Sequence, residues 1–268
     1  MIVVVLKAFE LLFKFLRENR PEIIYFSKNY LLVNKPYDLL INSNNKNQYT
    51  IQTYLRRKVP EHINNKLYHD FYFVHRLDYA TSGILCIPLN KNACKITFSL
   101  FQLRQIRKYY LAIVRGVISQ ELLFINLAIG ENCIDTAAQK MCTNDRSYCV
   151  KAKDAMTVLL VLETGLYDSY PCTKVLVKPI TGRRHQIRVH CSALGHTIVG
   201  DYTYSNKKDT KPHRMFLHSH RLKLPNVEED IDVQTKDPFR GLKNWIRLES
   251  INELDDGAYN KIDEFVKY

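Results

Sequence analysis

Short runs of apolar, β-branched and aromatic residues, each bounded by turn residues, recur along this chain and constrain its fold more than any other feature. Such runs predict β-strands, and they outnumber the segments with helical spacing. Strands and helices also follow one another without the regular β-α-β alternation of a doubly wound sheet. The pattern therefore predicts an α+β fold.

The individual elements can be assigned from their boundaries. Two short strands are expected around a Ser-Lys-Asn turn within 22–36, and further strands at 83–89, 108–116, 155–164, 173–180 and 214–224. Helices are expected where a capping residue precedes a periodic segment: after Thr50, after Asn90, and from Thr181-Gly182 to Gly195. The polar segment 131–153 is expected to be an irregular loop or insertion.

The same pattern predicts three regions along the chain. Residues 1–20 form an amphipathic helix, expected to dock on the body of the protein. Its charges argue against a secretory signal, and its acidic residues disfavour a mitochondrial presequence. Residues 21–240 form one domain, which the family resemblance described below makes the catalytic domain, and 241–268 form a mostly helical extension in which Trp245 is a packing anchor.

Charge and cysteine content restrict the partners and the compartment. The net charge of +12 indicates an acidic partner, usually nucleic acid, although an anionic membrane surface or solubility alone would also account for it. Seven cysteines without a C-x-x-C pair favour free thiols in a reducing intracellular compartment. We expect the cytoplasm or nucleus, with the mitochondrion as an alternative. No apolar run is long enough to cross a bilayer, and the histidines and cysteines lack the spacing of a zinc site.

The stretch HRLDYATSG, residues 75–83, gathers polar side chains directly before an apolar run. Asp78 therefore lies where a loop enters a buried strand, and a rigid sheet could aim its carboxylate into a cleft. Asp, Thr, Ser and Gly are also ordinary turn residues, so a purely structural turn is the alternative.

A second polar cluster opens the expected helix near residue 183. Arg183 and Arg184 would lie in its first turn, where cations are unfavourable and where an anion such as a nucleic-acid phosphate could compensate. The alternative is that both side chains reach solvent or a carboxylate. Arg188 lies one turn further along, between apolar residues, and needs a carboxylate partner if it is buried. Asp78 is a candidate, and the pair would keep the carboxylate ionised.

Together these segments resemble the RluA-type RNA pseudouridine synthases. HRLDYATSG is similar to that family's H-R-L-D-x-x-T-S-G signature, and residues 33–42 to its upstream N-K-P motif. KYYLAIVRG at 108–116 is similar to its K-x-Y-L-A strand, and residues 178–201 to its K-P-x-T-G-R-x-H-Q-I-R segment. FLHSHRLKLP is similar to its late L-H-A-x-x-L strand. The closest resemblance is to eukaryotic RNA pseudouridylate synthase domain-containing proteins.

The resemblance implies a mixed, largely antiparallel central sheet with a cleft flanked by helices and loops. It also implies that specific uridines in RNA are isomerised to pseudouridine, without a cofactor or metal. Asp78 would be the catalytic aspartate, either attacking the anomeric carbon or stabilising charge there while a glycal forms. Tyr110 would pack against the uracil and act as a base, and Arg188 would pair with the aspartate. Arg76 would fill the gap left by a flipped base.

Several residues near these motifs are expected to contact RNA. They are Arg76, His75, Lys35, Arg183, Arg184 and His185. The partner would be transfer, ribosomal or messenger RNA, bound by a monomer without membrane insertion.

The chain departs from the family pattern at Asp38, where the upstream motif usually has glycine, and Tyr109 beside Tyr110 leaves the tyrosine assignment open by one residue. Strand alternation allows only one of the two to enter the site.

Two other functions are compatible with parts of the sequence. One is an inactive RNA-binding protein that retains the fold, which the intact set of Asp78, Tyr110 and Arg188 argues against. The other is a hydrolase with Asp78 as nucleophile and His75 as base. No oxyanion-hole glycine motif accompanies that pair.

Overall fold

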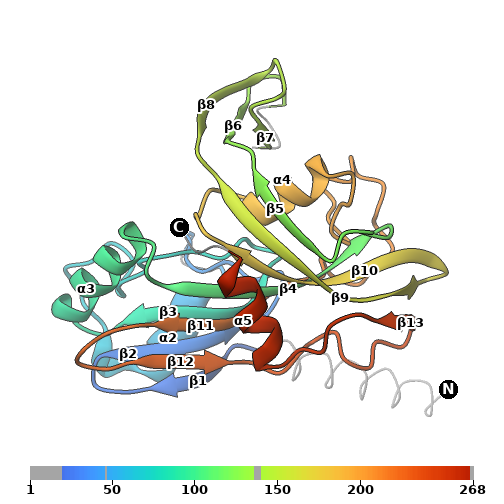
Figure 1. The fold of residues 1–268 in the computed structure, drawn as a ribbon. Coiled ribbons are helices and arrows are strands. Elements are labelled where there is room, and N and C mark those ends of the chain that lie inside the picture. The colour runs from blue at the N-terminus through green and yellow to red at the C-terminus, as the bar shows by residue number, and fades with distance from the viewer. Residues whose placement is uncertain (1–19, 46, 136–139, 266–268) are drawn as a thin grey trace, which may run out of the picture. The chain divides into compact units, whose positions relative to one another are not determined.

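The computed structural model describes residues 20–45, 47–135 and 140–265 (Figure 1). Contacts divide the chain into two compact units, Met1–Phe98 and Ser99–Tyr268. Apart from its last residue, the amphipathic helix expected at 1–20 lies outside the described residues. The catalytic domain expected at 21–240 includes parts of both units, and its limits stay a prediction.

The first unit contains an antiparallel sheet in the order β1-β2-β3 (Figure 1). Its strands are β1 (Glu22–Phe26), β2 (Tyr30–Lys35) and β3 (Ser82–Pro88). A tight turn joins β1 to β2, since the Ser27 hydroxyl accepts from the Tyr30 amide at 3.0 Å. Every residue of β3 is buried, as its uninterrupted apolar sequence predicts.

Two helices of this region begin at the caps that the sequence predicts. Thr50 opens α2 (Ile51–Lys58), and it and Thr53 form a reciprocal capping box. Asn90 opens α3 (Lys91–Gln102), where its side-chain oxygen accepts from the Ala93 amide at 2.9 Å. Helix α2 packs its apolar side chains against those of β2 and β3, and a short 3₁₀ helix, η1 (Pro60–His62), follows it. Local hydrogen bonding thus sets both helix starts.

The second unit is built on an antiparallel sheet in the order β12-β11-β4-β10-β9-β13, with β5 also paired to β9 (Figure 1). Its strands are β4 (Arg107–Arg115), β5 (Leu122–Asn126), β9 (Met156–Tyr167), β10 (Tyr170–Pro179), β11 (Leu217–Leu224), β12 (Ile231–Gln234) and β13 (Trp245–Ser250). Asp168 and Ser169 both have positive φ, 50° and 67°, as the tight β9–β10 hairpin requires. Sheets with few helices confirm the α+β class.

The segment expected to be irregular at 131–153 contains a small three-stranded sheet instead. It consists of β6 (Ile129–Asn132) between β7 (Met141–Thr143) and β8 (Cys149–Lys153). These strands are short, and most side chains of β8 are exposed. Backbone pairing therefore defines these three strands, and their sequence has no apolar periodicity from which they could be predicted.

The C-terminal segment was expected to be mostly helical, but it begins with a strand. β13 pairs with β9, and only then does the chain form α5 (Asp256–Glu264). The ring of Trp245 covers Gly165, where an added Cβ would lie only 2.8 Å from the ring. Trp245 is thus a packing anchor, as predicted, but on a strand.

A β-bulge interrupts β11 at His220. Ser219 pairs with Tyr110 and Arg221 with Tyr109, which leaves His220 as the extra residue. His220 is 1% exposed, and its Nε2 has no hydrogen-bond partner among the described residues. Burial is the main reason that the pKa of His220 falls from 6.5 to about 4.

This histidine predicts an acid-sensitive fold. Between pH 6.5 and 4 the unfolded chain binds a proton at His220 that the native state does not, so stability should fall as the pH falls through this window. The contribution is about 3 kcal/mol. Urea unfolding of His220→Phe should show a shallower loss of stability from pH 6.5 to 4 than the parent protein. Equal slopes would contradict the assignment, and measurements at pH 8 serve as the reference.

Candidate functional site

The Asp78 loop lies immediately before the buried strand β3. The Thr81 amide donates to the Asp78 carbonyl at 3.1 Å, which closes a turn between the two residues. The Asp78 side chain is half-buried, whereas β3 behind it is fully buried. A rigid strand thus fixes the position of a partly accessible carboxylate, as the sequence predicts.

Lys35 holds this loop in place. It is completely buried, and its ammonium donates to the carbonyls of Pro36, Leu39 and Tyr79 at 2.9, 2.7 and 3.0 Å. The Leu39 amide also donates to the Tyr79 carbonyl, at 3.3 Å. The N-K-P segment is therefore tied to the residue that directly follows Asp78. The sequence predicts that Lys35 contacts RNA, but in the structure its buried ammonium donates hydrogen bonds to backbone carbonyls instead.

Asp38, the departure from the family pattern, has φ of 52°. This left-handed conformation is the one that glycine adopts without strain, and aspartate tolerates it better than most residues. The loop therefore keeps a conformation suited to the usual glycine although the residue differs.

His75 and Arg76 have different surroundings. The Nε2 atom of His75 accepts a hydrogen bond from the Cys86 amide at 2.8 Å, so this nitrogen is occupied in holding β3. That contact argues against His75 as the base of a hydrolase. Arg76 is exposed, and its contact with RNA stays a prediction.

A groove of about 680 Å³ lies beside the N-K-P loop. Its lining combines aromatic and basic side chains, which suit stacked bases and phosphates. Its lining includes Arg20, Tyr37, Tyr49, Tyr54, Arg57 and Lys58.

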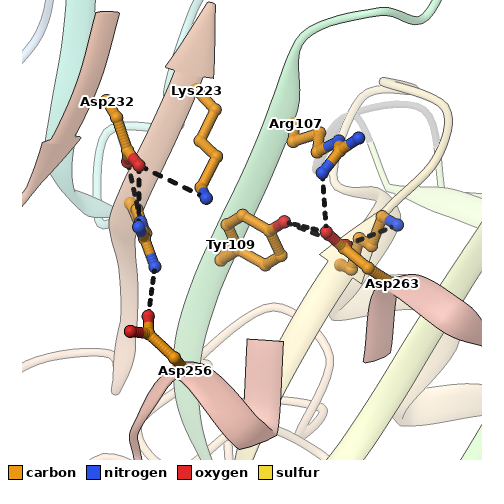
Figure 2. A network of polar contacts seen from close by, with 8 residues as sticks. Arg107, Tyr109, Lys223, Asp232, Asp256 and Asp263 are labelled. Carbon is orange, nitrogen blue, oxygen red and sulfur yellow. Dashed lines mark hydrogen bonds and ion pairs between the residues drawn. The ribbon is translucent and has the colours of Figure 1, made fainter. Parts of the chain in front are cut away.

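The two adjacent tyrosines of β4 have separate environments. Tyr109 is fully buried, and its hydroxyl lies 2.8 and 2.7 Å from the two carboxylate oxygens of Asp263 on α5. Figure 2 shows Asp263 between Tyr109 and Arg107, whose guanidinium lies 3.0 Å away. Burial, reinforced by Asp263, raises the pKa of Tyr109. Tyr109 thus docks α5, and Tyr110, which is half-buried, faces the other side of the strand.

The helix near residue 183 begins later than the sequence predicts. Helix α4 spans Gln186–Ala193, and His185 before it is left-handed with φ of 57°. Arg183 and Arg184 therefore precede the helix, and the expected conflict with its dipole does not arise. The Gln186 side chain accepts from the Arg183 amide at 2.9 Å and from the Thr181 hydroxyl at 2.6 Å, which holds the turn together.

The side chains of this turn reach neighbouring elements. Arg183 donates to the Asp154 carbonyl at 2.8 Å, and the Nε of Arg184 lies 3.2 Å from the Met141 sulfur. The Nδ1 of His185 lies 3.1 Å from the Tyr204 hydroxyl. Arg184 remains exposed, and RNA contact by these three residues stays a prediction.

Arg188 has a carboxylate partner that sequence reasoning missed. Its Nε and Nη2 donate to the two oxygens of Asp201 at 2.7 and 2.8 Å. Arg188 is 7% exposed and Asp201 1% exposed, so this is a buried bidentate ion pair. Asp201 is the last residue of the motif at 178–201. Its place in that motif is the sequence signal that could have identified it as a site residue.

Asp201 and Tyr204 extend this pair into a network. Asp201 also accepts from the amides of Thr203 and Tyr204, both at 3.1 Å. The Arg188 guanidinium lies 5.0 Å from the centre of the Tyr204 ring. The Met141 amide donates to the Tyr204 hydroxyl at 3.0 Å, which connects α4 to β7. Arg188 is thereby held in one orientation.

The three expected catalytic side chains belong to different units. Asp78 lies in the first unit, and Tyr110 and Arg188 lie in the second. The pairing of Arg188 with Asp78 stays a prediction beside the observed pair with Asp201. Within the described ranges, no group of three or more potential ligands could hold a metal ion, and no helix is long and apolar enough to cross a membrane.

Comparison with known proteins identifies the family. The sequence model described as RNA pseudouridylate synthase matches residues 29–193. The RNA pseudouridylate synthase domain-containing protein 1 of Danio rerio is 43% identical over 237 residues, covering 87% of this chain and 81% of that relative. The tRNA pseudouridine synthase C of Yersinia pestis is 30% identical over 239 residues, covering 82% and 89%.

A solved structure agrees. Human RNA Pseudouridylate Synthase Domain Containing 1 aligns with a TM-score of 0.81 at 38% identity, covering 91% of this chain and 95% of that one. The fold and motifs thus define an RNA-modifying isomerase. The chain belongs to the RNA pseudouridylate synthase family.

Lys35 provides a first test of the loop. Lys35→Met removes the buried donor that three carbonyls share and should lower the free energy of unfolding by about 2–3 kcal/mol. Chemical denaturation measures the change, with Lys66→Met at an exposed position as the control. A loss no larger than that of the control would show that the ammonium does not stabilise the loop.

Asp201 provides a second test. Asp201→Asn removes the charged acceptor of a buried cation and should cost about 2–3 kcal/mol of unfolding free energy. Asp232→Asn is the matched control, since Asp232 forms a similar bidentate pair with Arg221 but is 40% exposed. The control should lose less than about 1 kcal/mol. Equal losses in denaturant unfolding would count against a special role for the buried pair.

Proposed function

We propose that this protein isomerises specific uridines in RNA to pseudouridine, with Asp78 as the catalytic carboxylate. The observation that carries the proposal is the family match to residues 29–193, which includes Asp78, Tyr110 and Arg188, each within its motif. The rigid support of Asp78 by β3 and the fixed orientation of Arg188 are consistent with a preorganised site.

In this reaction the N–C glycosidic bond breaks, the uracil turns, and a C–C glycosidic bond forms. The proton at the new carbon attachment leaves, and the ring nitrogen gains one, so that atoms balance without a cofactor. Asp78 either attacks the anomeric carbon or stabilises positive charge there while a glycal forms. Tyr110 packs against the uracil; in the glycal route it also accepts the proton from the sugar carbon next to the anomeric carbon and returns it when the C–C bond forms.

A stacked nucleotide does not expose its glycosidic bond, so the target base must leave the stack. Arg76, which is exposed next to the Asp78 turn, is suited to occupy the space left by the base. The excess of basic residues attracts the RNA backbone. The groove beside the N-K-P loop offers tyrosines for unpaired bases and cations for phosphates.

Relatives named tRNA pseudouridine synthase C make transfer RNA the first substrate to test, with ribosomal and messenger RNA next. We further propose that the protein acts as a monomer in a reducing compartment, the cytoplasm or nucleus. Its seven cysteines are all free thiols, which supports such a compartment.

The test compares the parent protein with Asp78→Asn on transfer RNA transcripts. Nucleoside mass spectrometry should detect pseudouridine with the parent protein, and a loss of at least about 1,000-fold in rate with the variant, because the amide cannot serve as nucleophile or anionic stabiliser. RNA affinity should stay within about twofold, since binding is mostly phosphate contact.

Asp145→Asn, which removes an exposed carboxylate, is the control and should retain full activity. Pseudouridine formation by Asp78→Asn at the parental rate would refute the role of Asp78. RNA binding by the parent protein without product on any of the three RNA classes would favour the inactive RNA-binding alternative.

A further inference from the structure

We propose that Lys108 and Gly182 form a contact for an RNA backbone phosphate beside the target nucleotide, an inference that rests on the proposed function. Both residues lie in the second unit, Lys108 on β4 and Gly182 in the turn before α4. The ammonium of Lys108 lies 3.6 Å from the position that a Cβ of Gly182 would occupy.

Among the described residues, Lys108 has no carboxylate partner. Its ammonium lies 5.7 Å from the centre of the Phe101 ring, a cation–π contact. It is partly buried, and this burial lowers the pKa of Lys108 from 10.5 to about 8. Neighbouring Arg107 and Lys178, in contrast, both pair with Asp263. An unpaired, partly desolvated ammonium is suited to bind an anion.

Strand geometry relates Lys108 to the reaction. The bulge opposite this stretch lies in β11, and β4 itself has no extra residue between Lys108 and Tyr110, so these two residues, two positions apart, face the same side of the sheet. Tyr109, between them, faces α5. A phosphate held by Lys108 would therefore approach β4 from the side of the expected catalytic tyrosine.

Gly182 is the second, independent observation. Its φ is not positive, so its backbone conformation does not require glycine, and an added Cβ would meet only the Lys108 ammonium at an ordinary distance. The residue is exposed. Packing among the described residues therefore leaves the glycine unexplained, whereas close approach of a ligand to the backbone accounts for it.

Lys108 also lines a groove of about 1000 Å³, whose other lining residues include Arg107, Lys223, Asp232 and Asp263, labelled in Figure 2. The groove is mixed in charge, so it offers no general attraction for RNA, and Lys223 within it already lies 3.3 Å from Asp232. Other charged groups that face the groove are Arg104, Arg107, Lys178, Asp230, Asp263 and Glu264. Burial is the cause of the lowered pKa of Lys108.

The test measures the affinity of a fluorescent single-stranded RNA for the full chain at several salt concentrations. Lys108→Met should weaken binding about tenfold, and the slope of log affinity against log salt should shrink by about 0.7. Lys108→Arg should restore both. Lys243→Met, which removes an exposed charge elsewhere, is the control and should change affinity less than twofold.

Gly182→Ala and pH provide readouts that a structural role would not change. Gly182→Ala should weaken RNA binding several-fold while the melting temperature stays level or rises, since alanine restricts the unfolded chain. Between pH 7 and 9, RNA affinity of the parent protein should approach that of Lys108→Met, whereas Lys108→Arg should keep its affinity.

The proposal is overturned if Lys108→Met binds RNA as the Lys243→Met control does, or if Gly182→Ala binds RNA with parental affinity. Melting temperatures within a few degrees of the parent protein establish that the variants fold. Pseudouridine formation is measured in parallel. Absence of product with the parent protein would refute the proposed function, and the affinity comparison would still decide whether Lys108 and Gly182 contact phosphate.

Discussion

The buried pair between Arg188 and Asp201 is the interaction on which the second unit's part of the site depends. A guanidinium removed from water is stable only when a carboxylate and further hydrogen bonds satisfy it. Asp201 supplies both oxygens and is itself fixed by two backbone amides. Tyr204 then connects the pair to β7. As a result α4, the loop after it and the small three-stranded sheet share one polar network, and Arg188 is oriented before any substrate binds.

Much of the fold follows from local sequence signals. The strands β1 to β4 and β9 to β11 coincide with apolar runs, because burial on a sheet requires them. The caps Thr50 and Asn90 open helices because their side chains satisfy free amides nearby in the chain. The resemblance to the family's motifs identifies the catalytic candidates, and the position of Asp78 before a buried strand supports one of them independently.

Other features depend on contacts that local sequence does not encode. β6, β7 and β8 are defined by backbone pairing between polar segments, which have no periodic signature. His185 adopts a left-handed conformation, so α4 begins after both arginines, where pattern alone placed them inside the helix. Asp201 pairs with Arg188 because the fold brings the two side chains together, and no local sequence pattern identifies this pair. Lys35, which the sequence predicts to contact RNA, is instead buried and stabilises the loop, because three carbonyls converge on its ammonium.

The opposite orientations of Tyr109 and Tyr110 have an evolutionary consequence. One side of β4 binds α5, because Arg107 and the buried phenol of Tyr109 both hydrogen-bond to Asp263 on that helix. A substitution on that side must be matched by a change on the helix, whereas residues on the other side are free of that constraint. In homologues, Arg107 and Tyr109 should therefore covary with the residues of the C-terminal helix, whereas Lys108 and Tyr110 should not.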